Sequence, residues 1–235
     1  MEAVLFDLEG TLVETLYQRS REDLNKLRRE VKRKLIDLGV SDEALIGLVS
    51  ATLLRNRAYE WVETNMNQAE SDSLHAELGA FMKPFEMRSA RLARLYPDTL
   101  EALTKLASRG VKMGIATNTS REAATYMLGN FGLKIFFKVV VTRNDVSRLK
   151  PDPAMIHVAI ARMGVVVGWL VGDMLFDAEA ARGAGLKSII VRRDGVRPRF
   201  SYDYFADSLS CVESTVFKNK ASNRDEINLD YKSMV

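Results

Sequence analysis

Short apolar runs alternate with segments of helical periodicity along most of this chain. Uninterrupted apolar runs of four or five residues are typical of strands buried on both faces of a parallel sheet. Segments with a helical repeat separate the later runs, which favours right-handed crossovers between parallel strands. The expected strands are Ala3 to Phe6, Met113 to Thr117, Val139 to Thr142, Trp169 to Gly172 and Ser188 to Val191.

The region from about Leu16 to Leu95 has a different pattern, because it contains almost no strand signal. Leucines and a valine recur there at spacings of three and four from Leu24 to Leu38, and Gly39 ends that helix. A second helix is expected to be capped at Ser41-Asp42-Glu43, and a third to open at Ser71-Asp72. The sequence therefore predicts a helical insertion between the first strand and the rest of the sheet.

Composition limits the function classes. The 235 residues are 47% hydrophobic, which is enough for one core plus a smaller unit. Lys+Arg of 34 against Asp+Glu of 31 is too balanced for a nucleic-acid or anionic-membrane surface. No apolar run approaches the roughly 18 residues of a membrane span, and the single Cys211 fits a reducing compartment. We therefore expect a cytoplasmic protein, a monomer or homodimer, with neither nucleic acid nor membrane as partner.

Polar residues follow four of the expected strands. They are Asp7, the segment Thr117-Asn118-Thr119, Lys150, and the pair Asp173 and Asp177. Each alone has an ordinary explanation as a turn, a helix cap or a solvated charge. Because the carboxyl ends of parallel strands meet at one edge of a sheet, we expect these groups to share a crevice.

This set of side chains suits phosphoryl transfer through a covalent aspartyl intermediate. A carboxylate that approaches a phosphate dianion meets a repulsion of about 4 kcal/mol per charge pair at 4 Å. Mg²⁺ held by Asp7 and Asp173, together with the Lys150 ammonium, would offset that repulsion. Thr117 and nearby backbone N–H groups would bind phosphate oxygens, and Asp177 would orient Lys150 or a metal-bound water.

Four motifs in these positions resemble those of the haloacid dehalogenase superfamily, most of whose members are Mg²⁺-dependent phosphatases. They are Phe6-Asp7-Leu8-Glu9-Gly10-Thr11-Leu12-Val13, Ala116-Thr117-Asn118, Lys150-Pro151-Asp152-Pro153, and Gly172-Asp173 with Asp177. The resemblance covers the core and implies an α/β fold. Within the superfamily, the sequence is similar to the phosphoglycolate phosphatase type. That fold has a Rossmann-like parallel sheet with helices on both faces and a smaller all-helical cap. The expected boundaries are core 1–15 and 92–217, cap 16–91, and a polar tail at 218–235.

The resemblance also implies roles for individual residues. Asp7 would be the nucleophile, and Lys150, Thr117 and Asn118 would act on the phosphate. The Mg²⁺ ligands would be Asp7, Asp173 and the main-chain carbonyl of Glu9. The family pattern has a second aspartate, the general acid, where this chain has Glu9. The extra methylene moves the carboxyl by more than ~1 Å, a displacement that can cost on the order of 10²-fold in rate.

Three functions remain open from the sequence. The first is a phosphatase for a small phosphorylated metabolite, and the second is a metal-independent 2-haloacid dehalogenase, which needs no leaving-group acid. The third is a non-catalytic protein that keeps phosphate binding. On the insertion, Arg55 and Arg57 are candidates to bind a substrate carboxylate, although arginines on helices are more often solvated.

Overall fold

The computed structural model describes residues 3–218, and its centre is a six-stranded sheet in the order β5-β4-β1-β6-β7-β8. Every neighbouring pair in this sheet is parallel. The fold class expected from the sequence is confirmed. The strands are β1 (Ala3–Phe6), β4 (Met113–Ala116), β5 (Phe137–Val141), β6 (Val167–Gly172), β7 (Lys187–Val191) and β8 (Tyr204–Ala206).

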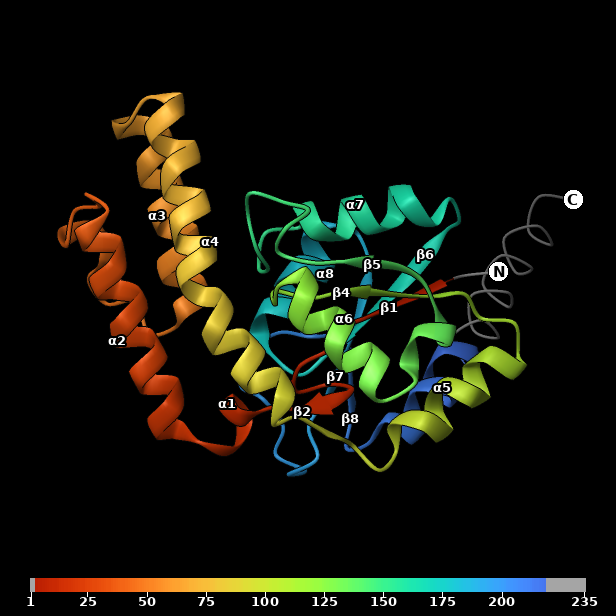
Figure 1. The fold of residues 1–235 in the computed structure, drawn as a ribbon. Coiled ribbons are helices and arrows are strands. Elements are labelled where there is room, and N and C mark those ends of the chain that lie inside the picture. Colours follow the sequence, from red (N-terminus) through yellow and green to blue (C-terminus); the bar gives the residue numbers. More distant parts are fainter. Residues whose placement is uncertain (1–2, 219–235) are drawn as a thin grey trace, which may run out of the picture.

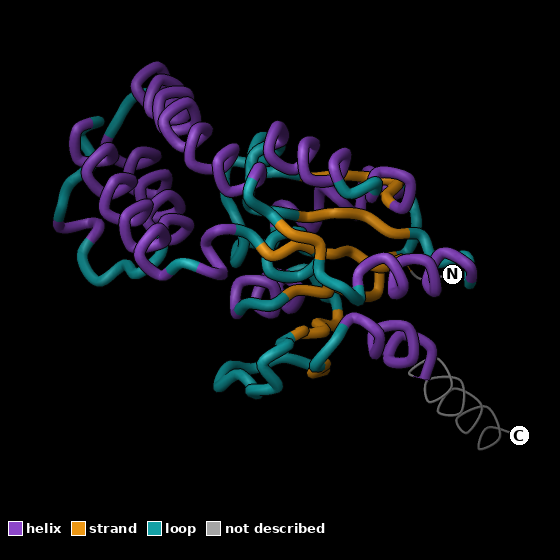
Figure 2. The backbone as a smooth tube through the Cα atoms, turned by 60° about the horizontal axis from the view of Figure 1, so that its bottom comes forward, coloured by secondary structure: helices purple, strands orange, loops and turns teal. Residues whose placement is uncertain are grey.

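Helices cover both faces of the sheet (Figures 1 and 2). The alternation of side chains along β1 sends Val4 and Phe6 into the core on one face and Ala3 and Leu5 into the core on the other. One face is covered by α5 (Thr99–Ser108), α6 (Arg121–Asn130), the 3₁₀ turns Leu133–Phe136 and Leu209–Cys211, and a helical segment at 212–218. The other is covered by α7 (Ala154–Met163) and α8 (Leu175–Gly183).

The strand order reverses its direction at β1. After β1 the chain builds β4 and β5 on one side, and then returns to place β6, β7 and β8 on the other. At such a reversal two successive crossovers leave in opposite directions, which opens a crevice at the carboxyl end of the central strand. Asp7, the first residue after β1, therefore lies at the mouth of this crevice.

The helical insertion stands beside the sheet, at the left of Figure 1. We call its helices the cap, and the sheet with its covering helices the core. The cap has its own apolar interior, which includes Leu35, Leu54 and Leu78. Its elements are α1 (Leu16–Arg19), α2 (Arg21–Asp37), the 3₁₀ turn Glu43–Leu45, α3 (Ala51–Asn65) and α4 (Gln68–Arg91).

The two connections between core and cap pair with each other. Strand β2 (Val13–Glu14) leads into the cap and strand β3 (Arg94–Leu95) leads out of it, and they form an antiparallel two-stranded ribbon. The chain therefore leaves and re-enters the core at one place.

Two expected helix starts in the cap are wrong. Ser41-Asp42-Glu43 leads only into the 3₁₀ turn, whereas α3 begins at Ala51, where the Ser50 hydroxyl accepts a hydrogen bond from the N–H of Leu53 at 3.0 Å. The third helix begins at Gln68 instead of near Ser71, because Asn67 and Glu70 form a reciprocal capping box. In both cases the helix begins at the place where a side chain accepts a hydrogen bond from a backbone N–H group of the first turn.

Other features qualify the picture drawn from the sequence. Strand β8 was not expected, because three residues give no visible apolar run. The polar tail expected at 218–235 lies, apart from residue 218, outside the described residues.

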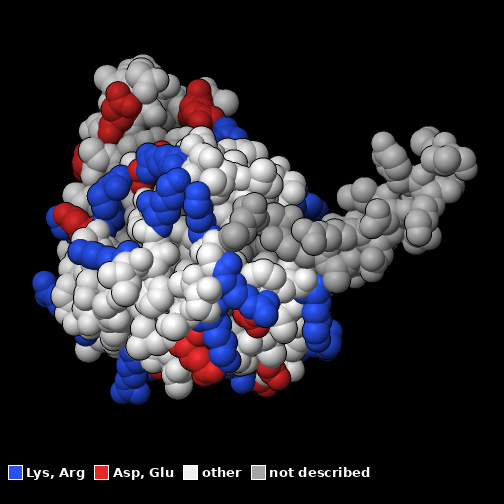
Figure 3. All heavy atoms as spheres, turned by 90° about the vertical axis from the view of Figure 1, so that its right-hand side faces the viewer, with Lys and Arg blue, Asp and Glu red and all other residues white. Residues whose placement is uncertain are grey.

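Within 3–218, no helix combines the length and apolarity needed to cross a bilayer. On the face of the core turned away from the cap, lysines and arginines form small groups with acidic side chains beside some of them (Figure 3).

Candidate active site

The loops after β1, β4, β5 and β6 bring the expected polar groups together. The Lys150 ammonium is buried and donates to Asp7 Oδ1 at 2.8 Å, to Asp177 Oδ1 at 2.7 Å and to the carbonyl of Ala116 at 2.8 Å. Thr117 is buried beside them, and its N–H donates to the carbonyl of Val141. Groups separated by as many as 170 positions in the sequence therefore share one crevice.

Two asparagine side chains hold the backbone that carries Lys150. The Asn118 carboxamide accepts from the N–H of Lys150 at 3.0 Å and donates to its carbonyl at 3.1 Å. The Asn56 carboxamide, on α3 of the cap, makes the same pair of bonds to Leu149, at 3.0 and 2.8 Å. The backbone of Leu149 is therefore held by the cap, and that of Lys150 by the core.

Three carboxylates form an acidic cluster at the crevice. Asp7, Asp173 and Asp177 each place one oxygen within 4.8 Å of the others. Asp177 Oδ2 accepts from the N–H groups of Asp173 and Met174, whereas Asp173 Oδ1 is buried without a hydrogen-bond partner within residues 3–218. A buried, unpartnered carboxylate oxygen beside two other carboxylates suits a hard divalent cation with oxygen ligands, so these residues fit a metal.

Glycine at two positions makes this cluster possible. Gly10 has φ of +87°, and a Cβ there would lie 2.4 Å from Asp173 Oδ2. A Cβ on Gly172 would lie 2.2 Å from Cγ of Asp177. Any side chain at either position would displace a carboxylate of the cluster.

Burial and the closeness of several charged groups shift the pKa values of Asp7, Asp173 and Lys150. The pKa of Asp7 is raised to about 6, because burial and the Asp177 carboxylate together outweigh the lowering by Lys150. Burial, followed by repulsion from Asp177 and Asp7, raises the pKa of Asp173 well above its usual value. Burial lowers the pKa of Lys150, but the Asp177 and Asp7 carboxylates outweigh it and hold that pKa above its usual value. The crevice therefore holds an excess of buried negative charge, which a cation would relieve.

Glu9 lies in the same cavity, close to a second acid. Burial, followed by the charges of Asp7 and Glu86, raises the pKa of the Glu9 carboxyl to about 8. Glu86, on α4, is itself paired with Arg143 of the core at 2.7 and 2.9 Å, and both side chains are buried. At neutral pH Glu9 is therefore mostly protonated and able to give up a proton.

These groups line a cavity of about 390 Å³ that is closed on one side by the cap. Sequence reasoning did not find its cap wall or the Glu86–Arg143 pair. From sequence alone, a glutamate within a helix is normally interpreted as exposed to solvent. Nothing in the sequence near Glu86 identifies its partner, which lies 57 positions away. The core adds Met174 and Phe176 to the lining, and the cap contributes Tyr17, Gln18, Leu24, Leu27, Ser50, Ala51, Thr52, Met82 and Glu86.

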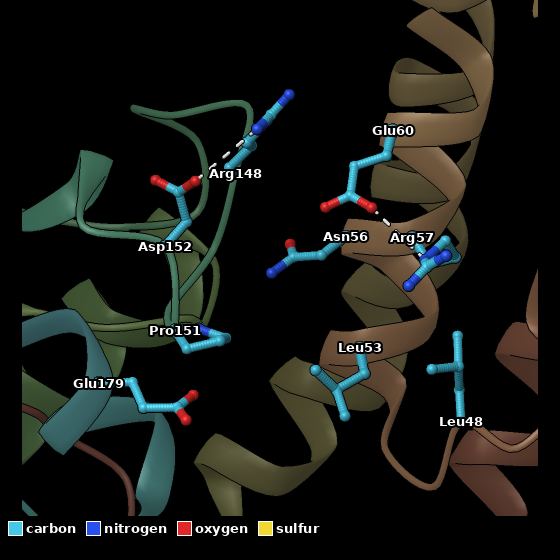
Figure 4. Close-up of a pocket in the computed structure, with 9 residues that line it drawn as sticks. All are labelled: Leu48, Leu53, Asn56, Arg57, Glu60, Arg148, Pro151, Asp152 and Glu179. Carbon is cyan, nitrogen blue, oxygen red and sulfur yellow. Dashed lines mark ion pairs between the residues drawn. The ribbon is translucent and has the colours of Figure 1, made fainter. Parts of the chain in front are cut away.

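The two arginines singled out on the insertion lie elsewhere. Neither is among the described residues that line the catalytic cavity. Arg57 lies beside Glu60, at 3.4 Å, in a separate groove of about 350 Å³ between α3 and the Pro151 loop (Figure 4). Arg55 is buried and donates from Nε to the Tyr59 hydroxyl at 2.8 Å, so the expectation of a solvated side chain is wrong for this residue.

Comparison with known proteins agrees with the motifs. The family model of the haloacid dehalogenase-like hydrolases matches residues 4–191. A phosphoglycolate phosphatase of Rhodospirillum rubrum is 31% identical over 231 residues, covering 95% of this chain and 90% of the relative. The crystal structure of a HAD phosphatase from Thermococcus onnurineus has a TM-score of 0.57 at 26% identity, covering 92% of this chain and 98% of that one.

A haloacid dehalogenase-like hydrolase of Bacteroides fragilis, 23% identical, shares the fold with a TM-score of 0.61 and covers 90% of this chain and all of its own. The family match spans most of the chain, and it includes every strand from β1 to β7. The chain belongs to the haloacid dehalogenase-like hydrolases and is a phosphatase-type enzyme of that family.

Proposed function

We propose that this protein is a Mg²⁺-dependent phosphatase that hydrolyses a small phosphorylated metabolite through an aspartyl-phosphate intermediate on Asp7. The observation that carries the proposal is the contact of the Lys150 ammonium with Asp7 and Asp177, in a cavity where Asp173 keeps an unpartnered carboxylate oxygen. The phosphatase names of its relatives support the same reading.

In the first step an oxygen of Asp7 attacks phosphorus and the bond from phosphorus to the leaving oxygen breaks. Glu9 donates its proton to that oxygen, so the leaving group departs as a neutral alcohol. In the second step water attacks the phosphorus of the acyl phosphate, Glu9 accepts a proton from the water, and Asp7 is released together with inorganic phosphate. The raised pKa of Glu9 suits it to the acid role of the first step.

The remaining residues bind the phosphate and hold the nucleophile. Lys150 places a positive charge beside Asp7, and its backbone is fixed by Asn118. Because the Asn118 carboxamide is occupied in this way, its contribution to phosphate binding passes through Lys150. Thr117, buried in the same cavity, would bind a phosphate oxygen with its hydroxyl and backbone.

Asp7, Asp173 and the main-chain carbonyl of Glu9 would hold the metal, with Asp177 beside them as the partner of Lys150. When bound, Mg²⁺ supplies positive charge that offsets the repulsion between the phosphate and the carboxylates. Binding would be visible without turnover as an increase in the melting temperature on adding Mg²⁺. Asp173→Asn should abolish this increase, and Asp37→Asn, an exposed control on α2, should leave it unchanged.

A direct test compares two reactions. Release of p-nitrophenol from p-nitrophenyl phosphate should require Mg²⁺, and chloride should not be released from 2-chloropropionate. The reverse result would favour a dehalogenase, against which the acidic cluster argues because carbon–halogen cleavage needs no metal carboxylate. Absence of both reactions in a folded protein that still binds phosphate would favour a non-catalytic role.

A further inference from the structure

The two ends of the catalytic cavity differ in chemistry. One end holds the acidic cluster, Lys150 and Thr117, and it would receive the phosphate. Along the rest of the lining, where the leaving group of a bound phosphomonoester would lie, apolar side chains predominate beside uncharged polar ones, which are Tyr17, Gln18, Ser50 and Thr52. The apolar side chains are Leu24, Leu27 and Met82 of the cap and Met174 and Phe176 of the core.

Positive charge is confined to the phosphate end. Of the described residues that line this cavity, Lys150 is the cation, and its ammonium is already shared among Asp7, Asp177 and the Ala116 carbonyl. The charged group at the cap end is a carboxylate, Glu86, and both of its oxygens are bound by Arg143. An anionic leaving group would lose water there without gaining a cationic side chain as its partner.

The cation that could challenge this conclusion is Arg55. It lines a neighbouring cavity of about 490 Å³, together with Tyr59, His75 and Arg143. Glu86 faces the catalytic cavity and Arg143 faces this second one, so their ion pair stands between the two. Nη1 of Arg55 has no hydrogen-bond partner among the described residues, but the side chain is not one of those that line the catalytic cavity.

We propose that the natural substrate is a phosphomonoester whose leaving group is uncharged and largely apolar. This inference rests on the proposed phosphatase function and refines it. It separates this chain from an enzyme for phosphoglycolate, the substrate in the name of the Rhodospirillum rubrum relative, because the leaving group of phosphoglycolate carries a carboxylate.

A matched pair of substrates tests the inference. Benzyl phosphate and 4-carboxybenzyl phosphate have leaving alcohols of similar basicity and differ by one distal carboxylate. With saturating Mg²⁺, we expect kcat/KM for benzyl phosphate to exceed that for the carboxylate by about tenfold or more, because a charge left without a partner is rejected strongly. Phosphoglycolate should fall on the slow side of the comparison.

The outcomes separate the two proposals. Equal or faster turnover of 4-carboxybenzyl phosphate or of phosphoglycolate would overturn the substrate class and leave the phosphatase function intact. Failure to hydrolyse any of these esters or p-nitrophenyl phosphate, in a folded protein with Mg²⁺, would overturn both.

Two variants sharpen the result. Leu24 is 41% exposed at the apolar end, so Leu24→Arg should fold and should narrow the preference by raising kcat/KM for the carboxylate about tenfold. Arg55→Met should leave the ratio of the two substrates unchanged, provided that its melting curve shows a folded protein. A selective loss of 4-carboxybenzyl phosphate turnover in Arg55→Met would show that Arg55 reaches the substrate and would contradict the inference.

Discussion

The core wall and the cap wall of the catalytic cavity are built in opposite ways. The core wall gathers polar groups from four strand ends, and Lys150 lies between Asp7 and Asp177 and binds both. The cap wall presents apolar side chains of helices, and its carboxylate, Glu86, is neutralised by Arg143 of the core. We infer from this difference that the core wall carries the reaction chemistry and that the cap wall contributes to substrate selection. We therefore expect substitutions in the two walls to have separate effects.

The largest effect should come from the centre of the core wall. Asp7→Asn removes the nucleophile but keeps the shape of the side chain, so kcat should fall by about 10³-fold or more. Steady-state turnover of p-nitrophenyl phosphate measures this loss, and Asp37→Asn on the surface of α2 serves as the matched control. Residual activity above a tenth of the wild-type rate would exclude Asp7 as the nucleophile.

Lys150→Met should be the next most severe change. It leaves Asp7 and Asp177 buried without their shared cation, so both activity and stability should suffer. We expect kcat/KM to fall on the order of 10²-fold or more, with a melting temperature lowered by several degrees. A variant that loses activity without any loss of stability would contradict the view that Lys150 also holds the fold of the core wall together.

Glu9 should give a pH signature. Because its pKa is raised to about 8, the acid is protonated below that pH, and kcat should fall as the pH rises through about 8. Glu9→Gln should lower kcat by about 10²-fold and remove this alkaline limb. Glu9→Asp should keep or raise kcat. A large fall in that variant would show that the site has been rebuilt around the longer side chain.

The smallest effect should come from the contact between the walls. Asn56→Ala removes both hydrogen bonds from α3 to Leu149, and with them the grip of the cap on the residue before Lys150. We expect kcat to fall by about three- to tenfold with a smaller change in KM, since each neutral bond contributes about 1 kcal/mol. Asn65→Ala is the matched control, because Asn65 lies on the same helix and its carboxamide donates to Trp61 and Thr64 of that helix.

The contrast between the walls also explains what could be predicted from the sequence. Apolar runs that end in Asp7, Thr117 and Asp173 fix both a strand and the position of the polar group after it, so the edge of the sheet followed from the pattern. Crossover rules predicted that these strands are parallel, but they predicted neither the strand order nor the short strand β8. The residues of the core wall could therefore be predicted from the sequence.

The residues of the cap wall could not be predicted from the sequence in this way. Helical periodicity identifies which face of a helix is buried, but it does not identify the element against which that face packs. The pairs that seat the cap, Glu86 with Arg143 and Asn56 with Leu149, join residues 57 and 93 positions apart. Neither pair has a local signal, and Arg55 was expected in solvent because its burial depends on the same tertiary contacts.

The antiparallel ribbon of β2 and β3 has an evolutionary consequence. Because both junctions of the helical insertion lie side by side, Val13 opposite Leu95 and Glu14 opposite Arg94, the sheet does not depend on what is spliced between them. Recombination at this junction would exchange the whole insertion without cutting the sheet, but it would also remove the contacts of Asn56 and Glu86 with the core. A replacement insertion would therefore have to bring its own hydrogen-bond partners for Leu149 and Arg143.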